Sequence, residues 1–170
     1  MFGIFKKKST QETTTPDSPQ YASAPGTQIS YNPDLIPRLK SDHLELLAIY
    51  SEISELFADK KYEKVSQKLT SLRTKLQDHL LTENVRLYIY LDYMMKHDET
   101  NSGLIRSFRR EMDGIAKVAI NFLKKYDAIG VDPELAPSFA KDFAEIGDVL
   151  GKRIKREEQV LYPLYMESYA

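Results

Sequence analysis

Five ionisable side chains fall among leucines and aromatic residues at positions that repeat every three or four residues. They are His43, His79, Glu83, Arg153 and Glu157. An ionisable side chain in an apolar core is costly unless it is paired or bound to a metal. His79 and Glu83 are four residues apart, so they share one face of a helix. Helical bundles use facing imidazoles and carboxylates to hold iron, and these residues therefore predict a buried polar centre.

The elements that must position this centre are four stripes of mainly apolar residues with helical spacing. The stripes span residues 36–57, 62–90, 104–126 and 139–164. Steps of three and four place the members of each stripe on one helix face. The second stripe includes Arg86 and the fourth includes Val160. Because no stretch of the sequence shows sustained alternation typical of strands, we expect an all-α fold.

Polar and turn-forming segments separate the stripes. They are residues 59–61, 97–103 and 130–137, and the second of these contains the turn signal Asn101-Ser102-Gly103. Short connections join neighbouring helices in an antiparallel arrangement. The sequence therefore predicts an up-down-up-down four-helix bundle over residues 34–170. Tyr88, Tyr90 and Tyr93 are expected to cap one end of it with their hydroxyls in water.

The segment before the first stripe has a different composition. Residues 9–33 are rich in Ser, Thr, Pro, Gln and Gly, so residues 1–33 are predicted to form a disordered N-terminal arm. Residues 1–8 place apolar side chains before three lysines, the reverse of a signal peptide, which predicts a cytoplasmic protein. These eight residues supply at most weak contact with an anionic membrane, and we favour no contact.

Composition narrows the function classes. Lys and Arg total 24 and Asp and Glu total 25, which argues against a nucleic-acid binder. There is no cysteine, so thiolate metal sites and cysteine nucleophiles are absent. The sequence also shows no glycine-rich phosphate loop and no nucleophile–base set. We therefore expect a protein that is not an enzyme.

The polar residues of the stripes carry a family resemblance. The chain resembles the hemerythrin family and its cation-binding members over about residues 34–166. The resemblance rests on three segments: Asp42-His43-Leu44, His79-Leu-Leu-Thr-Glu83, and Glu157-Glu158 followed by Leu161-Tyr162-Pro163. The resemblance implies a hemerythrin-like bundle. It also implies that His43, His79, Glu83 and Glu157 form one metal site.

The second half of the chain departs from the family pattern. Met112 and Arg153 stand at positions where the resemblance implies histidine. The resemblance therefore implies at most one non-haem metal per chain, iron or another divalent cation. The leading hypothesis is a hemerythrin-like cation-binding protein that acts in binding or sensing rather than catalysis.

A metal-free interpretation stays open beside it. The permanent charge of Arg153 can neutralise Glu83 and Glu157 by hydrogen bonds, and a guanidinium opposes a nearby cation. His43 and His79 are then hydrogen-bonded core histidines, and no cofactor is needed.

A second resemblance leads to the same alternative. Residues 38–50 and 139–158, with Arg153 and the Glu157-Glu158 pair, are similar to the anti-sigma family known as regulator of sigma D. That likeness implies a metal-free regulatory bundle with a protein partner such as an RNA polymerase sigma factor.

Overall fold

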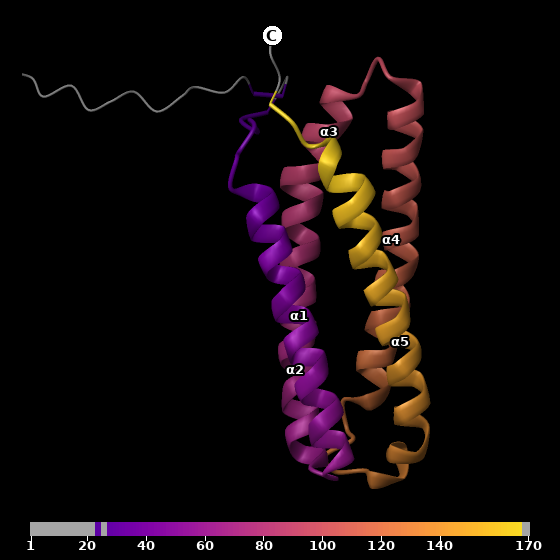
Figure 1. The fold of residues 1–170 in the computed structure, drawn as a ribbon. Helices are drawn as coiled ribbons and strands as arrows, with labels where there is room; N and C mark the ends of the chain where they lie inside the picture. The colour runs from indigo at the N-terminus through magenta and orange to yellow at the C-terminus, as the bar shows by residue number, and fades with distance from the viewer. Residues whose placement is uncertain (1–22, 25–26, 168–170) are drawn as a thin grey trace, which may run out of the picture.

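The computed structural model describes residues 23–24 and 27–167, which form an antiparallel four-helix bundle (Figure 1). Two of its helices are α1 (Leu35–Ala58) and α4 (Glu99–Tyr126). A third column runs through α2 (Tyr62–Thr82), a π-helical segment (Glu83–Tyr88) and α3 (Ile89–Met94). The fourth begins with a 3₁₀ turn (Pro133–Leu135) and α5 (Ala136–Arg156), and continues through a second π-helical segment (Glu157–Leu161) and a 3₁₀ turn (Tyr162–Leu164). The predicted all-α bundle is confirmed.

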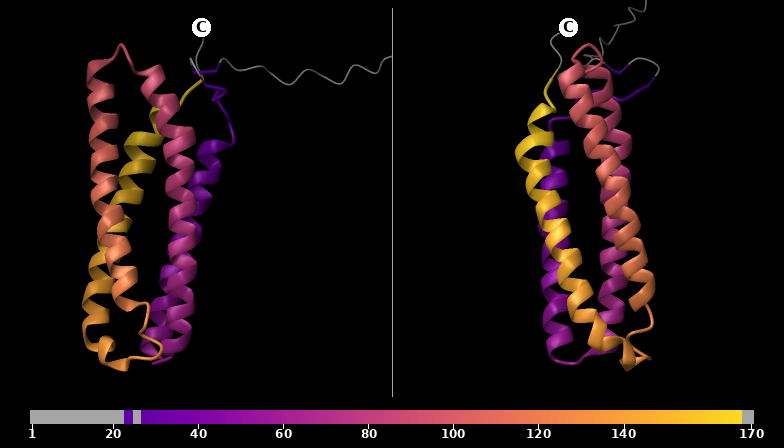
Figure 2. Two further views of the ribbon diagram at one scale, coloured as in Figure 1. Left: turned by 180° about the vertical axis from the view of Figure 1, so that it is seen from behind. Right: turned by 90° about the vertical axis from the view of Figure 1, so that its right-hand side faces the viewer.

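The four columns are arranged as a square. Contacts join α1 to α2, α2 to α4, and α4 to α5. The hydroxyl of Tyr50 donates to the carbonyl of Phe143 at 2.8 Å and so ties α1 to α5. The side view shows α1 beside α5 and α2 beside α4 (Figure 2). A side chain that points inward from any column can therefore reach the other three.

The core consists of two apolar clusters with a polar layer between them. One cluster contains Leu46, Leu76 and Phe143, and the other contains Leu39 and Leu161. The five ionisable residues that the sequence singled out are buried in the intervening layer. Apolar packing on both sides thus positions the polar groups and shields them from water.

The two π-helical segments change the register of the helices that contain them. Hydrogen bonds from residue i to i+5 accommodate one more residue per turn than an α-helix, so the buried face rotates. Arg86 and Val160, which the regular stripes placed inside, are exposed. Leu87 and Leu161 are buried instead. The helical periodicity was therefore wrong at Arg86 and Val160, inside the π-segments, while Tyr90 at the end of the second stripe is buried as predicted.

Helix α4 starts earlier than the sequence pattern predicted. The side chain of Asp98 accepts a hydrogen bond from the backbone nitrogen of Asn101 at 3.0 Å and caps the helix. Such a cap satisfies a free backbone donor of the first turn. The segment from Asn101 to Gly103 therefore lies inside the helix, and the expected turn there is wrong.

Residues just before α1 contact the end of the bundle. The rings of Tyr31 and Tyr165 stack with centroids 5.0 Å apart, and the backbone nitrogen of Asn32 donates to the Tyr165 hydroxyl at 2.7 Å. The disordered arm over residues 1–33 stays a prediction, and the membrane contact considered for residues 1–8 lies outside the described residues. Within the described part of the chain, no helix is both long and apolar enough to cross a bilayer.

Candidate metal centre

The structure brings together four potential metal ligands from three columns of the bundle. His43 comes from α1, His79 from α2, and Glu83 and Glu157 from the first positions of the two π-helical segments. All four are buried, and each offers one ligand atom within 4.8 Å of the others. Metal–ligand bonds of about 2.0–2.2 Å place donors that share an ion up to about 4.4 Å apart. The group is therefore close to the size that one ion requires.

Both carboxylates lie where an α-helix turns into a π-helix. Glu83 follows the last residue of α2, and Glu157 follows the last residue of α5. Single-turn π-segments inside α-helices occur frequently at functional sites because they re-aim side chains. Here the two segments place a glutamate from each of two columns on opposite sides of the same layer.

The Nδ1 nitrogen of each histidine lies near a carboxylate that is outside the group of four. His43 Nδ1 lies 2.8 Å from Glu158 Oε1, and His79 Nδ1 lies 3.4 Å from Asp42 Oδ2. Lys75 Nζ lies 2.6 Å from Asp42 Oδ1 and fixes that carboxylate in turn. Metal-binding histidines typically make such a bond with the nitrogen that is not bound to metal. Asp42 and Glu158 were not among the predicted site residues, although each lies next to a predicted ligand in the chain.

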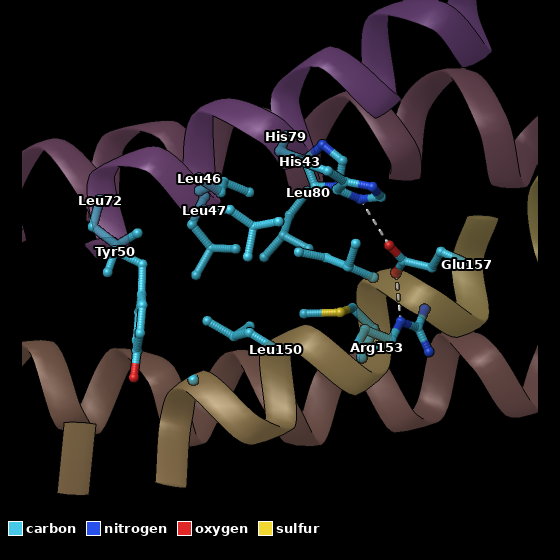
Figure 3. Close-up of a pocket in the computed structure, with 14 residues that line it drawn as sticks. His43, Leu46, Leu47, Tyr50, Leu72, His79, Leu80, Leu150, Arg153 and Glu157 are labelled. Carbon is cyan, nitrogen blue, oxygen red and sulfur yellow. Dashed lines mark hydrogen bonds and ion pairs between the residues drawn. The ribbon is translucent and has the colours of Figure 1, made fainter. Parts of the chain in front are cut away.

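The Nε2 nitrogens of both histidines face the two glutamates of the group. His43 Nε2 lies 3.1 Å from Glu157 Oε2, an ion pair drawn in Figure 3. His79 Nε2 lies 3.6 Å from Glu83 Oε1. Protons occupy this space when the imidazoles are charged. Metal binding requires neutral imidazoles and releases those protons.

One buried carboxylate oxygen has no partner. Tyr162 donates its hydroxyl to Glu83 Oε1 at 2.8 Å, and the same hydroxyl lies 3.2 Å from His43 Nε2. Glu83 Oε2 makes no hydrogen bond with any described residue, although only 1% of Glu83 is exposed. An unpaired buried acceptor is costly, and each one in a native protein calls for an explanation. A cation in this layer would satisfy it, so the residues present fit a metal ion.

The guanidinium of Arg153 is fully engaged on the other side of the layer. Its Nε donates to Glu157 Oε1 at 2.5 Å, its Nη1 to the Phe108 carbonyl at 3.0 Å, and its Nη2 to the Tyr88 hydroxyl at 2.9 Å. Within the described residues, none of these hydrogen bonds reaches Glu83. The expectation that Arg153 bonds both glutamates is therefore correct for Glu157 and wrong for Glu83.

Tyr88 has a role that the sequence pattern did not indicate. It was expected to place its hydroxyl in water, but Tyr88 is buried and accepts from Arg153. Tyr90 is also buried, and its hydroxyl donates to the Met166 carbonyl at 2.8 Å. The register change at the π-segment accounts for the burial of Tyr88, whereas Tyr90 already stood at the end of the predicted stripe, and the expectation that their hydroxyls lie in water is wrong for both.

The second half of the layer lacks the residues for another ion. Met112 is buried on α4 and, with Arg153, lines a cavity beside the histidines. A thioether and a guanidinium replace imidazoles there, and neither suits a hard or borderline divalent cation. The layer thus holds an unpaired oxygen on Glu83 and a fixed positive charge on Arg153, and no hydrogen bond joins these two residues.

Electrostatics in the layer favour charged histidine and charged glutamate in the absence of metal. Burial opposes protonation of His79, but the hydrogen bond and charge of Glu83 outweigh it and raise its pKa. Burial likewise opposes ionisation of Glu157, but His43 and Arg153 lower its pKa. Burial and the nearby glutamate charges raise the pKa of Tyr162, so its hydroxyl stays protonated. In the absence of metal, the layer therefore favours a protonated His79 and an ionised Glu157 that is paired with Arg153.

Comparison with known families agrees with this geometry. A model of the hemerythrin HHE cation-binding domain matches residues 34–165. The chain belongs to this family. Comparison with characterised proteins and with solved structures returned no match. The family and the buried histidine–glutamate cluster together support a divalent cation as the ligand of this bundle.

Proposed function

We propose that the protein binds one non-haem metal ion per chain, iron foremost, through His43, His79, Glu83 and Glu157. The observation that carries this proposal is the unpaired oxygen of buried Glu83, a residue of the group of four whose ligand atoms lie within 4.8 Å of one another, close to the size that one ion requires. Two imidazoles and two carboxylates suit ferrous iron, and also manganese or zinc. When bound, such an ion supplies a Lewis-acidic centre inside the bundle.

Arg153 limits the site to a single ion in this proposal. Its guanidinium is buried and bonded to Glu157, so it supplies on one side the positive charge that a second ion would bring. A fixed charge there opposes a further cation. In the metal-free interpretation Glu83 relies on protonated His79 and the Tyr162 hydroxyl rather than on Arg153, and its Oε2 still has no partner among the described residues.

We place the activity in binding or sensing rather than in catalysis, in the cytoplasm. The ionisable groups around the four ligands hold one another: Asp42 and Glu158 hold the histidines, and Tyr162 donates to Glu83. This leaves no obvious acid or base poised to transfer a proton to a substrate. Such an arrangement supports a centre that reports on the presence or state of its metal.

Anaerobic loading with ferrous iron, followed by metal analysis, tests the proposal. We expect one iron per chain in the wild type and less than a tenth of that in His43→Ala and His79→Ala. His97→Ala is the matched control, because His97 is exposed and lies outside the cluster. Two irons per chain would contradict the single site. A wild type that takes up no metal would favour the regulatory alternative, which titration with a purified sigma factor would then test directly.

A further inference from the structure

An apolar cavity of about 120 Å³ lies directly beside the candidate metal centre. One end is lined by the two histidines, Glu157 and Arg153. Figure 3 shows Leu46 and Leu47 of α1 facing Leu150 of α5 across the space, with Tyr50 at the far end. The cavity therefore extends from the ligand layer toward the apolar cluster that contains Leu46 and Leu76, and residues of α1, α2, α4 and α5 line it.

The far end of the cavity has a defined wall. The ring of Tyr50 stacks on Phe143 with centroids 4.0 Å apart, and its hydroxyl donates to the Phe143 carbonyl. A side chain on Gly147 would place its Cβ 2.1 Å from the Tyr50 hydroxyl oxygen, so the Tyr50 ring can occupy this position only against glycine. Tyr50 is thereby held across the end of the cavity and offers no free polar group to it.

The polar groups at the near end of the cavity already have hydrogen-bond or ion-pair partners. Arg153 donates to Glu157, Phe108 and Tyr88, and both ring nitrogens of His43 face carboxylates. The rest of the lining is leucine, isoleucine, methionine and glycine. A charged or strongly polar molecule would lose its water without gaining a partner. The lining therefore selects uncharged apolar molecules.

The size of the cavity sets the size of its occupant. Apolar cavities of about 150 Å³ in protein cores stay dry and take up benzene. This cavity is slightly smaller, and it is not fully enclosed, because one of its lining residues, Leu47, is 45% exposed. Pockets with mainly apolar walls and a few convergent polar groups are typical ligand sites.

We propose that this cavity binds an uncharged hydrocarbon-like molecule of about benzene size, and that the bound molecule lies next to the metal ion. The binding of the apolar molecule follows from the cavity alone. Only its effect on the metal rests on the proposed function. The metal centre would then sense an apolar ligand through direct contact with its coordination shell.

Benzene titration of the full-length protein, treated with a chelator to remove metal, tests the cavity. We expect a saturable rise in melting temperature in the wild type, because a ligand that binds only the folded state stabilises it. Leu150→Phe fills the cavity and should weaken benzene binding at least tenfold. Val149→Phe is the matched control, since Val149 lines a separate groove between α4 and α5. Benzoate should not compete with benzene.

A second filling variant, Leu47→Trp, covers the case in which Leu150→Phe does not fold. No saturable effect of benzene, equal binding by the wild type and the folded filling variant, or competition by benzoate would overturn the proposal.

The second arm uses protein loaded with cobalt(II), whose visible absorption reports its coordination. Benzene should shift these bands in the wild type and not in the filling variant. If benzene binds but the bands do not move, the proposed contact between benzene and the metal is wrong. If cobalt does not bind, the result counts against the proposed metal site, and the benzene titration of the metal-free protein alone decides the cavity proposal.

Discussion

Arg153 and Glu157 form a buried ion pair in which Arg153 Nε lies 2.5 Å from Glu157 Oε1, one helical turn away on the same column. The pair spans the junction of α5 with its π-segment. It assigns the positive charge of the layer to one side, where Met112 also lies. Glu83, whose Oε2 has no partner among the described residues, makes no hydrogen bond with Arg153. In the function proposed above, this asymmetry leaves room for one cation.

Removal of the guanidinium should destabilise the metal-free protein. Arg153→Met removes the permanent counter-charge of Glu157 and leaves it with His43 alone, and breaking a buried ion pair typically costs about 3–5 kcal/mol. Urea unfolding in the presence of a chelator measures the loss. Arg156→Met is the control, because Arg156 pairs with Glu111 at the surface and should cost less than about 1 kcal/mol. Equal losses in the two variants would show that the buried charge is not what matters.

Asp42 should control metal affinity without binding the metal. Asp42→Asn weakens the bond that orients His79, and loss of such a supporting carboxylate typically lowers metal affinity about 10–100-fold. Competition titration with a chromophoric chelator gives the dissociation constant. Asp78→Asn provides the comparison, since Asp78 is exposed and its ion pair with Arg38 lies at the surface. An unchanged dissociation constant in Asp42→Asn would remove Asp42 from the site.

Acidity should act in opposite directions on the metal-free fold and on metal binding. The pKa of His79 is raised above its ordinary value of 6.5. Protonated His79 therefore stabilises the metal-free protein fully below that value, and this stabilisation is lost as pH rises through the raised pKa. Metal binding must displace the same proton, so it strengthens over the same rise in pH.

The pH dependence is measured by unfolding wild type and His79→Gln from about pH 5.5 to about pH 8.5 with a chelator present. The difference in unfolding free energy between them should be largest at the acid end and shrink as pH rises. A difference that grows with pH would mean that burial, rather than Glu83, governs the ionisation of His79.

The regular part of this architecture was predictable because helical periodicity reports burial directly. The steps that place His43 and His79 among leucines identified both residues and the layer they share. The π-segments were not predictable in this way, because one added residue per turn leaves the apolar composition unchanged. As a result, the inward rotation of Tyr88 and Tyr162 could not be seen in the sequence.

The supporting carboxylates were missed for a related reason. Asp42 and Glu158 lie next to ligands in the chain, where a helix of regular spacing places side chains on a different face. Only the packing of α1 against α2 and α5 brings Asp42 to His79 and Glu158 to His43. A position next to a ligand in the sequence predicts a supporting role only when the packing of the neighbouring helices is also known.

Restoring imidazoles to the second half of the layer should convert the site into one for two ions. Met112→His combined with Arg153→His adds two ligands beside Glu157 and removes a permanent positive charge. Both changes favour another cation. Iron content after anaerobic loading should rise from at most one toward two per chain, and added iron should recover stability that the metal-free double variant loses. Met112→Leu with Arg153→Met is the control that removes the charge without adding ligands. If this control also gained a second iron, the charge of Arg153 alone, and not the missing histidines, would limit the wild type to one ion. If neither double variant exceeded one iron per chain, the second half of the layer would be closed to metal for a reason other than these two residues.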